Sequence, residues 1–229
     1  MSEDLKMEEK IISVEQMRKS DAYTIENFVE SKELMYRAAM GVYESYGEWR
    51  GKKIAIVVGG GNNGGDGYAL AGILKKNGID SDLIKISDKM SADGQYYWEI
   101  AKDAGVKFFQ YEKCEGENKE IVDKDGGDKA SEFNAYDVIV DCILGTGFQG
   151  EVRGKAKDAI EAINASSAYV ISVDINSGMN GDTGEAFTAV KSDLTVSIGF
   201  LKKGLVTDEA KKYIGRLVNV DIGIVLVEE

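Results

Sequence analysis

The sequence of 229 residues contains no histidine and no proline, and only two cysteines, Cys114 and Cys142. Without histidine there is no Ser-His-Asp triad, no histidine-ligated zinc and no imidazole general base. Acid–base chemistry must therefore come from Asp, Glu, Lys, Tyr or Cys side chains. Two cysteines provide neither a disulfide framework nor a metal-binding spacing, which favours a reducing, cytoplasmic location.

Long hydrophobic runs and an excess of positive charge are also missing. No apolar stretch approaches the roughly 20 residues of a membrane span, and the charged amino terminus, MSEDLKMEEK, is unlike a signal peptide. The net charge of −12 argues against nucleic acid and anionic membranes as partners of a broad surface. With 43% hydrophobic and 30% charged residues, the chain is expected to be a soluble globular domain over residues 1–229.

Glycine is abundant, and it is densest between Lys53 and Asn77. An apolar run typical of a buried strand, Ile54–Val58, is followed by three glycines and the segment NNGGDG, Asn62–Gly67. A helical pattern begins after Gly67 and ends at Asn77. A strand, a glycine-rich turn and a helix together form a phosphate-binding geometry, which indicates a ligand site. The alternative is an ordinary tight turn that needs glycine for positive φ.

The two common nucleotide-binding motifs fit this loop poorly. A P-loop has Lys-Ser or Lys-Thr after its last glycine, whereas this loop has Asp66 and Gly67. The dinucleotide fingerprint G-x-G-x-x-G can be placed on three glycines of the loop: Gly59, Gly61 and Gly64. Its acidic ribose partner, however, has only loosely placed candidates, Asp80 and Asp82. An NAD-dependent dehydrogenase would need this fingerprint and a hydride-transfer base, so it is the weaker hypothesis.

Strands and helices alternate along the rest of the chain. Two helices are expected between residues 13 and 47, and further helices at 91–105 and 155–165. Strands are expected at 82–86, 106–110, 138–141, 169–173, 194–198 and 216–221. Residues 112–132 have little periodicity and are interpreted as a surface segment. The alternation predicts a largely parallel sheet with helices on both faces.

Three apolar strands end in polar segments that contain glycine: Asn62–Gly67, Asp141–Gly147 and Asp174–Gly178. Ligands of open α/β sheets bind beyond the carboxyl ends of the strands, so these segments are expected to converge on one crevice. The crevice would contain four polar side chains: Asn63, Asp141, Asp174 and Ser177. Their hard oxygen atoms suit potassium better than a soft or more highly charged metal ion. The alternative is that the two aspartates merely cap the helices that follow their strands.

Four ordered motifs carry a family resemblance: NNGGDG (Asn62–Gly67), DVIVDCILGTGFQGEVRG (Asp137–Gly154), VDINSG (Val173–Gly178) and KKGL (Lys202–Leu205). Together with DAYTIE and LMYRAA nearer the amino terminus, they resemble the YjeF N-terminal domain, the NAD(P)HX epimerase family. The resemblance covers nearly the whole chain. It implies an α/β fold, a three-layer αβα sandwich with a Rossmann-like, mostly parallel sheet and extra N-terminal helices. It also implies a homodimer and one bound potassium ion.

The resemblance further implies an isomerase that interconverts the R and S forms of hydrated NADH and NADPH (NAD(P)HX) in nicotinamide-nucleotide repair. By carry-over, the potassium ligands would be Asn63, Asp141 and Ser177. The substrate-contacting positions would be Asn62, Asn63, Gly64, Gly65, Asp66, Gly145, Thr146, Gly147, Phe148, Gln149, Gly150, Glu151 and Asp174. Many relatives are fused to a dehydratase domain. This chain is too short to include one, so a dehydratase would be a separate partner.

The implied reaction needs acid–base catalysis. Loss of the hydroxyl at ring carbon six, assisted by the ring nitrogen, gives a planar cation that water can attack from either face. One group must protonate the leaving oxygen, and a base must guide water back. In the absence of histidine, Asp174 is our candidate for proton transfer. The pyrophosphate would lie against the N–H groups of the 145–151 turn.

The chain departs from the family pattern at two prolines. Asn176 stands where the family usually has a proline. The second proline of the family pattern, just before the lysine near Lys202, is also missing. Because proline restricts the backbone, a less rigid site is expected. The alternative function is a non-catalytic nucleotide-binding or scaffold domain of the same fold. A scaffold has no need of the crevice residues, which argues against that alternative.

Overall fold

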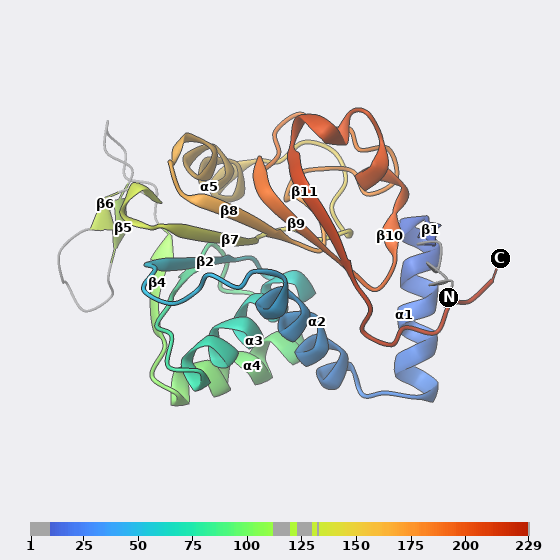
Figure 1. Cartoon of the computed structure of the whole chain (residues 1–229), viewed down its shortest axis with the longest axis horizontal. Helices are drawn as coiled ribbons and strands as arrows, with labels where there is room; N and C mark the ends of the chain where they lie inside the picture. The colour runs from blue at the N-terminus through green and yellow to red at the C-terminus, as the bar shows by residue number, and fades with distance from the viewer. Residues whose placement is uncertain (1–9, 112–119, 123–129, 132, 229) are drawn as a thin grey trace, which may run out of the picture.

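The structure, a computed structural model, describes residues 10–111, 120–122, 130–131 and 133–228, which are coloured in Figure 1. They contain a nine-stranded sheet in the order β11-β9-β8-β7-β2-β3-β4-β5-β6. The strands from β11 to β4 are parallel: β2 (Ile54–Val58), β3 (Asp82–Lys85), β4 (Lys107–Tyr111), β7 (Val138–Cys142), β8 (Tyr169–Val173), β9 (Ser192–Ile198) and β11 (Ile214–Val220). Two short antiparallel strands, β5 (Glu120–Val122) and β6 (Ala130–Ser131), extend one edge.

Successive residues of a strand point to opposite faces of the sheet, and this alternation builds two cores. Ile54, Ile56 and Val58 of β2 pack with one group of helices: α2 (Ser31–Ser45), α3 (Asn62–Lys76) and α4 (Ala92–Asp103). Ala55 and Val57 face the other side and pack in the same cluster as α5 (Gly154–Ala165). Figure 1 shows the resulting layers, which confirm the predicted αβα sandwich.

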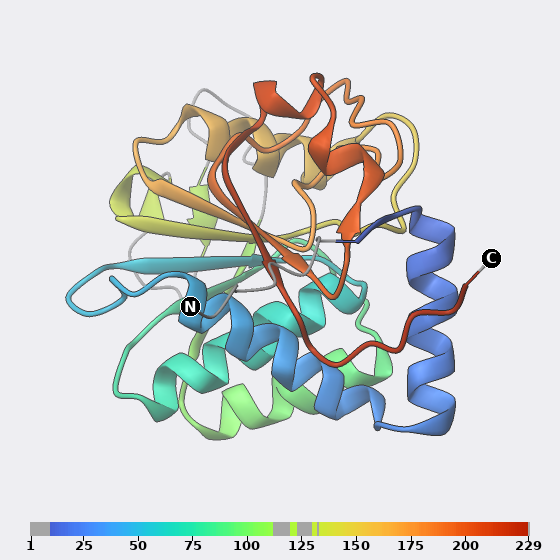
Figure 2. The same cartoon turned by 45° about the vertical axis from the view of Figure 1, so that its right-hand side comes forward.

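The amino-terminal helix α1 (Val14–Asn27) stands apart from these layers, beside one end of the sheet. Figure 2 shows the carboxyl-terminal segment crossing it. The Val225 N–H donates to Thr24 Oγ1 at 2.9 Å, and the Val227 N–H donates to Ser20 Oγ at 3.0 Å. Just before α1, β1 (Ile11–Ile12) pairs in parallel with β10 (Leu201–Lys202). Three 3₁₀ helices complete the described elements: Phe133–Ala135, Lys203–Val206 and Ala210–Lys212.

Most predicted elements agree with the structure to within two residues, but the start of α3 was predicted wrongly. The helix begins at Asn62, so NNGGDG forms its first turns and is not a loop before it. Glycine has low helix propensity, and here close packing explains its presence. A Cβ at Gly64 would lie 2.2 Å from the carbonyl oxygen of Gly59, and one at Gly65 would lie 2.5 Å from Met35 Cε.

The 112–132 segment was interpreted without strands, yet it contains β5 and β6. The rest of that interpretation falls on residues 112–119, 123–129 and 132, which lie outside the described residues. Assignment of residues 1–229 to a single domain stays a prediction.

Candidate active site

The strand order reverses between β2 and β7, because the chain adds β3 and β4 on one side and β8, β9 and β11 on the other. This switch point is where open α/β sheets bind ligands. Because β8, β7 and β2 are neighbours, the polar segments after them meet there, as predicted. A cavity of about 620 Å³ opens at this place.

Eight of the predicted site residues line the cavity: Asn62, Asn63, Asp66, Gly145, Thr146, Gly147, Phe148 and Asp174. Seven others do not: Gly64, Gly65, Asp141, Gln149, Gly150, Glu151 and Ser177. Asp141 and Ser177 are fully buried. The predicted residues thus divide between the cavity wall and positions away from it.

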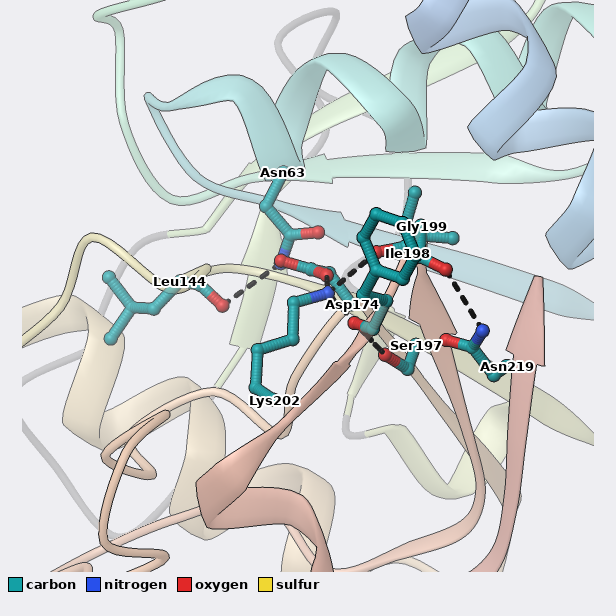
Figure 3. A network of polar contacts seen from close by, with 9 residues as sticks. Asn63, Leu144, Asp174, Ser197, Ile198, Gly199, Lys202 and Asn219 are labelled. Atoms are coloured by element: carbon teal, nitrogen blue, oxygen red, sulfur yellow. Dashed lines mark hydrogen bonds and ion pairs between the residues drawn. The ribbon is translucent and has the colours of Figure 1, made fainter. Parts of the chain in front are cut away.

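Asn63 lies in the first turn of α3 and reaches across to the segment after β7. Its Nδ2 donates to the Leu144 carbonyl oxygen at 2.9 Å, as Figure 3 shows. Its Oδ1 is buried and has no hydrogen-bond partner among the described residues. Burying an unpaired carbonyl oxygen costs free energy, so this atom is available to a ligand.

Asp141, at the end of β7, accepts hydrogen bonds from four donors. Oδ2 accepts from Ser172 Oγ and the Ser177 N–H, both at 2.9 Å, and Oδ1 accepts from the Ile143 N–H at 3.2 Å and from Ser177 Oγ. Burial raises the pKa of the Asp141 carboxyl, while these hydrogen bonds lower it in part. Asp141 therefore holds the ends of β7 and β8 and the Ser177 turn together, and caps no helix.

The three predicted potassium ligands come together around Leu144. Ser177 Oγ accepts from the Leu144 N–H at 2.8 Å, donates to Asp141, and lies 3.1 Å from the Leu144 carbonyl oxygen that Asn63 also contacts. The candidate ligand atoms for a cation are all oxygens, and one residue of the three supplies a carboxylate. One of these oxygens, Asn63 Oδ1, is buried and has no hydrogen-bond partner among the described residues. This set fits a weakly charged hard cation. No group of three or more His, Cys, Asp or Glu side chains suited to a metal occurs in the described part of the chain.

Asp174, at the end of β8, has a φ of 66°, the only positive φ of a non-glycine residue among those described. Such backbone strain persists only where surrounding structure holds it, and it is typical of functional positions. Its Oδ1 accepts a hydrogen bond from Lys202 Nζ, forming an ion pair that Figure 3 shows. The Lys202 side chain is 1% exposed and also donates to the Ile198 carbonyl oxygen at 2.7 Å. Asp174 is thus a charged carboxylate on the cavity wall.

Three further carboxyl groups line the same cavity, those of Asp21 in α1, Asp66 in α3 and Asp93 in α4. Burial raises the pKa of Asp66 well above its usual range, and the negative charges of Asp174 and Asp21 raise it further. Burial likewise raises the pKa of Asp21, with Asp174 adding to the effect. The wall therefore combines a carboxyl group paired with Lys202 with two carboxyl groups, those of Asp21 and Asp66, whose pKa is raised.

Sequence analysis did not identify three residues of this arrangement: Arg18, Asp21 and Lys202. Arg18 and Asp21 lie on α1, whose position beside the cavity depends on contacts with the distant carboxyl terminus. Asp21 occurs in the DAYTIE segment and Lys202 in KKGL, so both motifs were noticed without a role for these side chains. No local pattern marked Arg18.

Comparisons with known proteins identify the family of this chain. A family model described as YjeF-related protein N-terminus matches residues 31–204. The NAD(P)H-hydrate epimerase of Oenococcus oeni is 34% identical over 220 residues, covering 93% of this chain and 96% of that protein. The protein of the same name from Limosilactobacillus reuteri is 34% identical over 217 residues, covering 93% and 95%.

Two other matches extend the comparison. The bifunctional NAD(P)H-hydrate repair enzyme of Coxiella burnetii is 33% identical over 212 residues, which are 91% of this chain but 40% of that protein. The crystal structure of yeast ynu0 has the same fold, with a TM-score of 0.71 at 18% identity, covering 91% of this chain and 88% of that one. In the described residues, none of the helices has the length and apolar character of a membrane span. From the family match and these identities, the chain belongs to the YjeF-related protein N-terminus family.

Proposed function

We propose that this chain is an NAD(P)H-hydrate epimerase, an isomerase that interconverts the R and S forms of hydrated NADH and NADPH. Relatives of that name match nearly its full length. The structural observation that carries the proposal is a cavity at the switch point whose wall holds two carboxyl groups in different environments, Asp66 and Asp174. In a chain without histidine, such a pair supplies both a proton donor and a proton acceptor.

The two carboxyl groups suit different steps. The neutral Asp66 carboxyl donates a proton to the hydroxyl that leaves ring carbon six, which departs as water. The Asp174 carboxylate, held by Lys202, stabilises the planar cation and accepts a proton from the water that attacks it. Attack on either face then gives either epimer, the two groups exchange roles in the reverse direction, and proton exchange with solvent returns Asp66 to its protonated and Asp174 to its deprotonated form. The acid and base roles are thereby divided between two residues, with Asp66 as the acid and Asp174 as the base.

Potassium is the cofactor we propose. Asn63, Asp141 and Ser177 would hold it, and the buried, unpaired Asn63 Oδ1 supports this assignment. The ion would supply a fixed positive charge beside an acidic cavity. Without the ion, the Asn63 side chain connects the start of α3 to the Leu144 carbonyl oxygen, and the Ser177 side chain accepts a hydrogen bond from the Leu144 N–H.

The test follows epimerisation of NADHX by chromatography or NMR, with the spontaneous rate subtracted. We expect a rate above background that is higher in potassium chloride than in sodium chloride of equal ionic strength. Potassium should also raise the melting temperature of the parent protein, and Asn63→Ala should remove both effects because it removes the unpaired oxygen. A folded protein with no rate above background would favour a non-catalytic binding or scaffold domain.

The pH profile tests the role of Asp66. A carboxyl group donates its proton only while protonated, so activity should persist up to the raised pKa of Asp66 and fall above it. Asp66→Asn should lower kcat by about 100-fold or more and remove this fall at high pH. Asp93→Asn changes another aspartate that lines the cavity and serves as the control. Retention of the fall at high pH in Asp66→Asn would assign it to another group.

We also propose that the chain forms a homodimer and works with a separate dehydratase. Exposed apolar side chains at the end of α1 support self-association: Tyr23, Ile25 and Phe28 are 42%, 37% and 60% exposed. Sedimentation equilibrium would measure it, and a monomer at all concentrations would contradict it. The two-activity name of the Coxiella burnetii protein supports a dehydratase partner. The cytoplasmic location stays a prediction.

A further inference from the structure

The acidic cavity wall would repel the negatively charged pyrophosphate of a dinucleotide ligand. Four of its lining residues are acidic: Asp21, Asp66, Asp93 and Asp174. The net charge of the chain is −12. A pyrophosphate carries negative charge of its own, so its binding needs a nearby cation or several oriented N–H groups. Among the described residues that line the cavity, Arg18 is the only basic one.

Arg18 lies against the turn that follows β7. Its Nη2 donates to the Thr146 carbonyl oxygen at 3.0 Å, and a Cβ added at Gly147 would lie 3.8 Å from the same nitrogen. A guanidinium group has five N–H donors, so most of them stay available. No carboxylate of the described residues forms an ion pair with Arg18. The Val14 N–H donates to Asp182 Oδ1 at 2.8 Å and helps to fix the start of the helix that carries Arg18.

The backbone of the same turn offers further donors. The Phe148 N–H donates to the Gly145 carbonyl oxygen at 3.1 Å. For the N–H groups of Thr146 and Gly147, the described part of the chain provides no acceptor. Gly147 is exposed and Thr146 is half-buried, so a ligand in the cavity can reach this part of the turn. Free backbone N–H groups beside a guanidinium form a site for a phosphate oxygen.

We propose that Arg18 binds the pyrophosphate of the substrate together with the N–H groups of Thr146 and Gly147. This inference rests on the proposed function in that it takes the ligand to be a dinucleotide. Arginine suits the task because its planar fork can contact two phosphate oxygens at once. The competing role is positional: Arg18 would only hold the turn in place through Thr146.

Binding of ADP-ribose, which has the pyrophosphate but no nicotinamide ring, separates this inference from the chemistry. By isothermal titration calorimetry, Arg18→Met should raise the Kd for ADP-ribose by about 10- to 100-fold, since hydrogen bonds to charged groups are lost. Lys19→Met is the matched control, because it removes the same charge one residue away and Lys19 does not line the cavity. Its Kd should stay within about twofold of the parent value, as expected for an exposed charge. Equal losses in both variants would overturn the proposal.

Kinetics with two substrates would distinguish phosphate binding by Arg18 from the positional role. Arg18→Met should raise the KM for NADHX by about 10- to 100-fold with little change in kcat, because the contact is equal in the ground and transition states. With a hydrated reduced nicotinamide riboside, which has no phosphate, the variant should match the parent. A loss of kcat with both substrates would assign Arg18 to positioning the turn and overturn the proposal. If the parent protein does not bind ADP-ribose, the proposal for Arg18 is wrong. If the parent protein binds ADP-ribose but does not epimerise NADHX, only the proposed epimerase function is contradicted.

Discussion

Asp174→Asn is expected to lower the epimerase kcat by about 100- to 10,000-fold while the chain stays folded. The amide keeps the size of the carboxyl group but cannot accept a proton. Asparagine also tolerates positive φ better than most residues, so the backbone at φ 66° should be retained. The measurement is the NADHX epimerisation rate above the spontaneous background, with circular dichroism to check the fold.

The ion pair with Lys202 complicates this variant. Asparagine would leave a nearly buried ammonium without its carboxylate, and removing one partner of a buried pair costs about 3–5 kcal/mol. The double variant Asp174→Asn/Lys202→Met removes that unpaired charge and should recover part of the free energy of unfolding without recovering activity. If Asp174→Asn keeps a rate within about tenfold of the parent, Asp174 does not transfer the proton.

The central sheet could be predicted because its strands are short apolar runs rich in β-branched residues. Ile54–Val58 and Tyr169–Val173 have in the structure the bounds that the sequence predicted. The meeting of the segments after β2, β7 and β8 followed from the rule that parallel strands place their carboxyl ends at one edge. The start of α3 did not follow, since its glycines are required by contacts with Gly59 and Met35 that no local pattern reveals.

The electrostatics of the site could be predicted only in part. Asp174 was identified from its place at a strand end, but its pairing with Lys202, 28 residues later, depends on how the chain turns after β9. Arg18 contacts Thr146 across 128 residues of sequence. Periodicity reports which face of an element is buried, and it carries no information about such long-range polar contacts.

The missing proline at Asn176 predicted a less rigid site, and the structure indicates why the segment is nevertheless held. Asn176 is fully buried. Its Nδ2 donates to the carbonyl oxygens of Val190 and Tyr213, at 2.9 and 3.1 Å, and to Ser192 Oγ at 3.0 Å. Its Oδ1 accepts from Thr195 Oγ1 at 2.7 Å. Side-chain hydrogen bonds to β9 and to the residues just before β9 and β11 thus restrict the segment between Asp174 and Ser177.

Asn176→Ala should therefore lower the free energy of unfolding by about 3 kcal/mol or more, because it removes the four hydrogen bonds of a buried side chain at about 1 kcal/mol each and leaves the Val190 carbonyl oxygen without its side-chain donor. Urea denaturation followed by fluorescence measures the change. Asn164→Ala is the matched control: Asn164 bonds the Ala189 carbonyl oxygen and the Lys191 N–H, on either side of the Val190 that Asn176 contacts, but it is exposed. Water can replace its lost bonds, so its cost should be about 1 kcal/mol. Equal costs for the two variants would mean that burial of the Asn176 network adds nothing, and that the segment owes its order to other contacts.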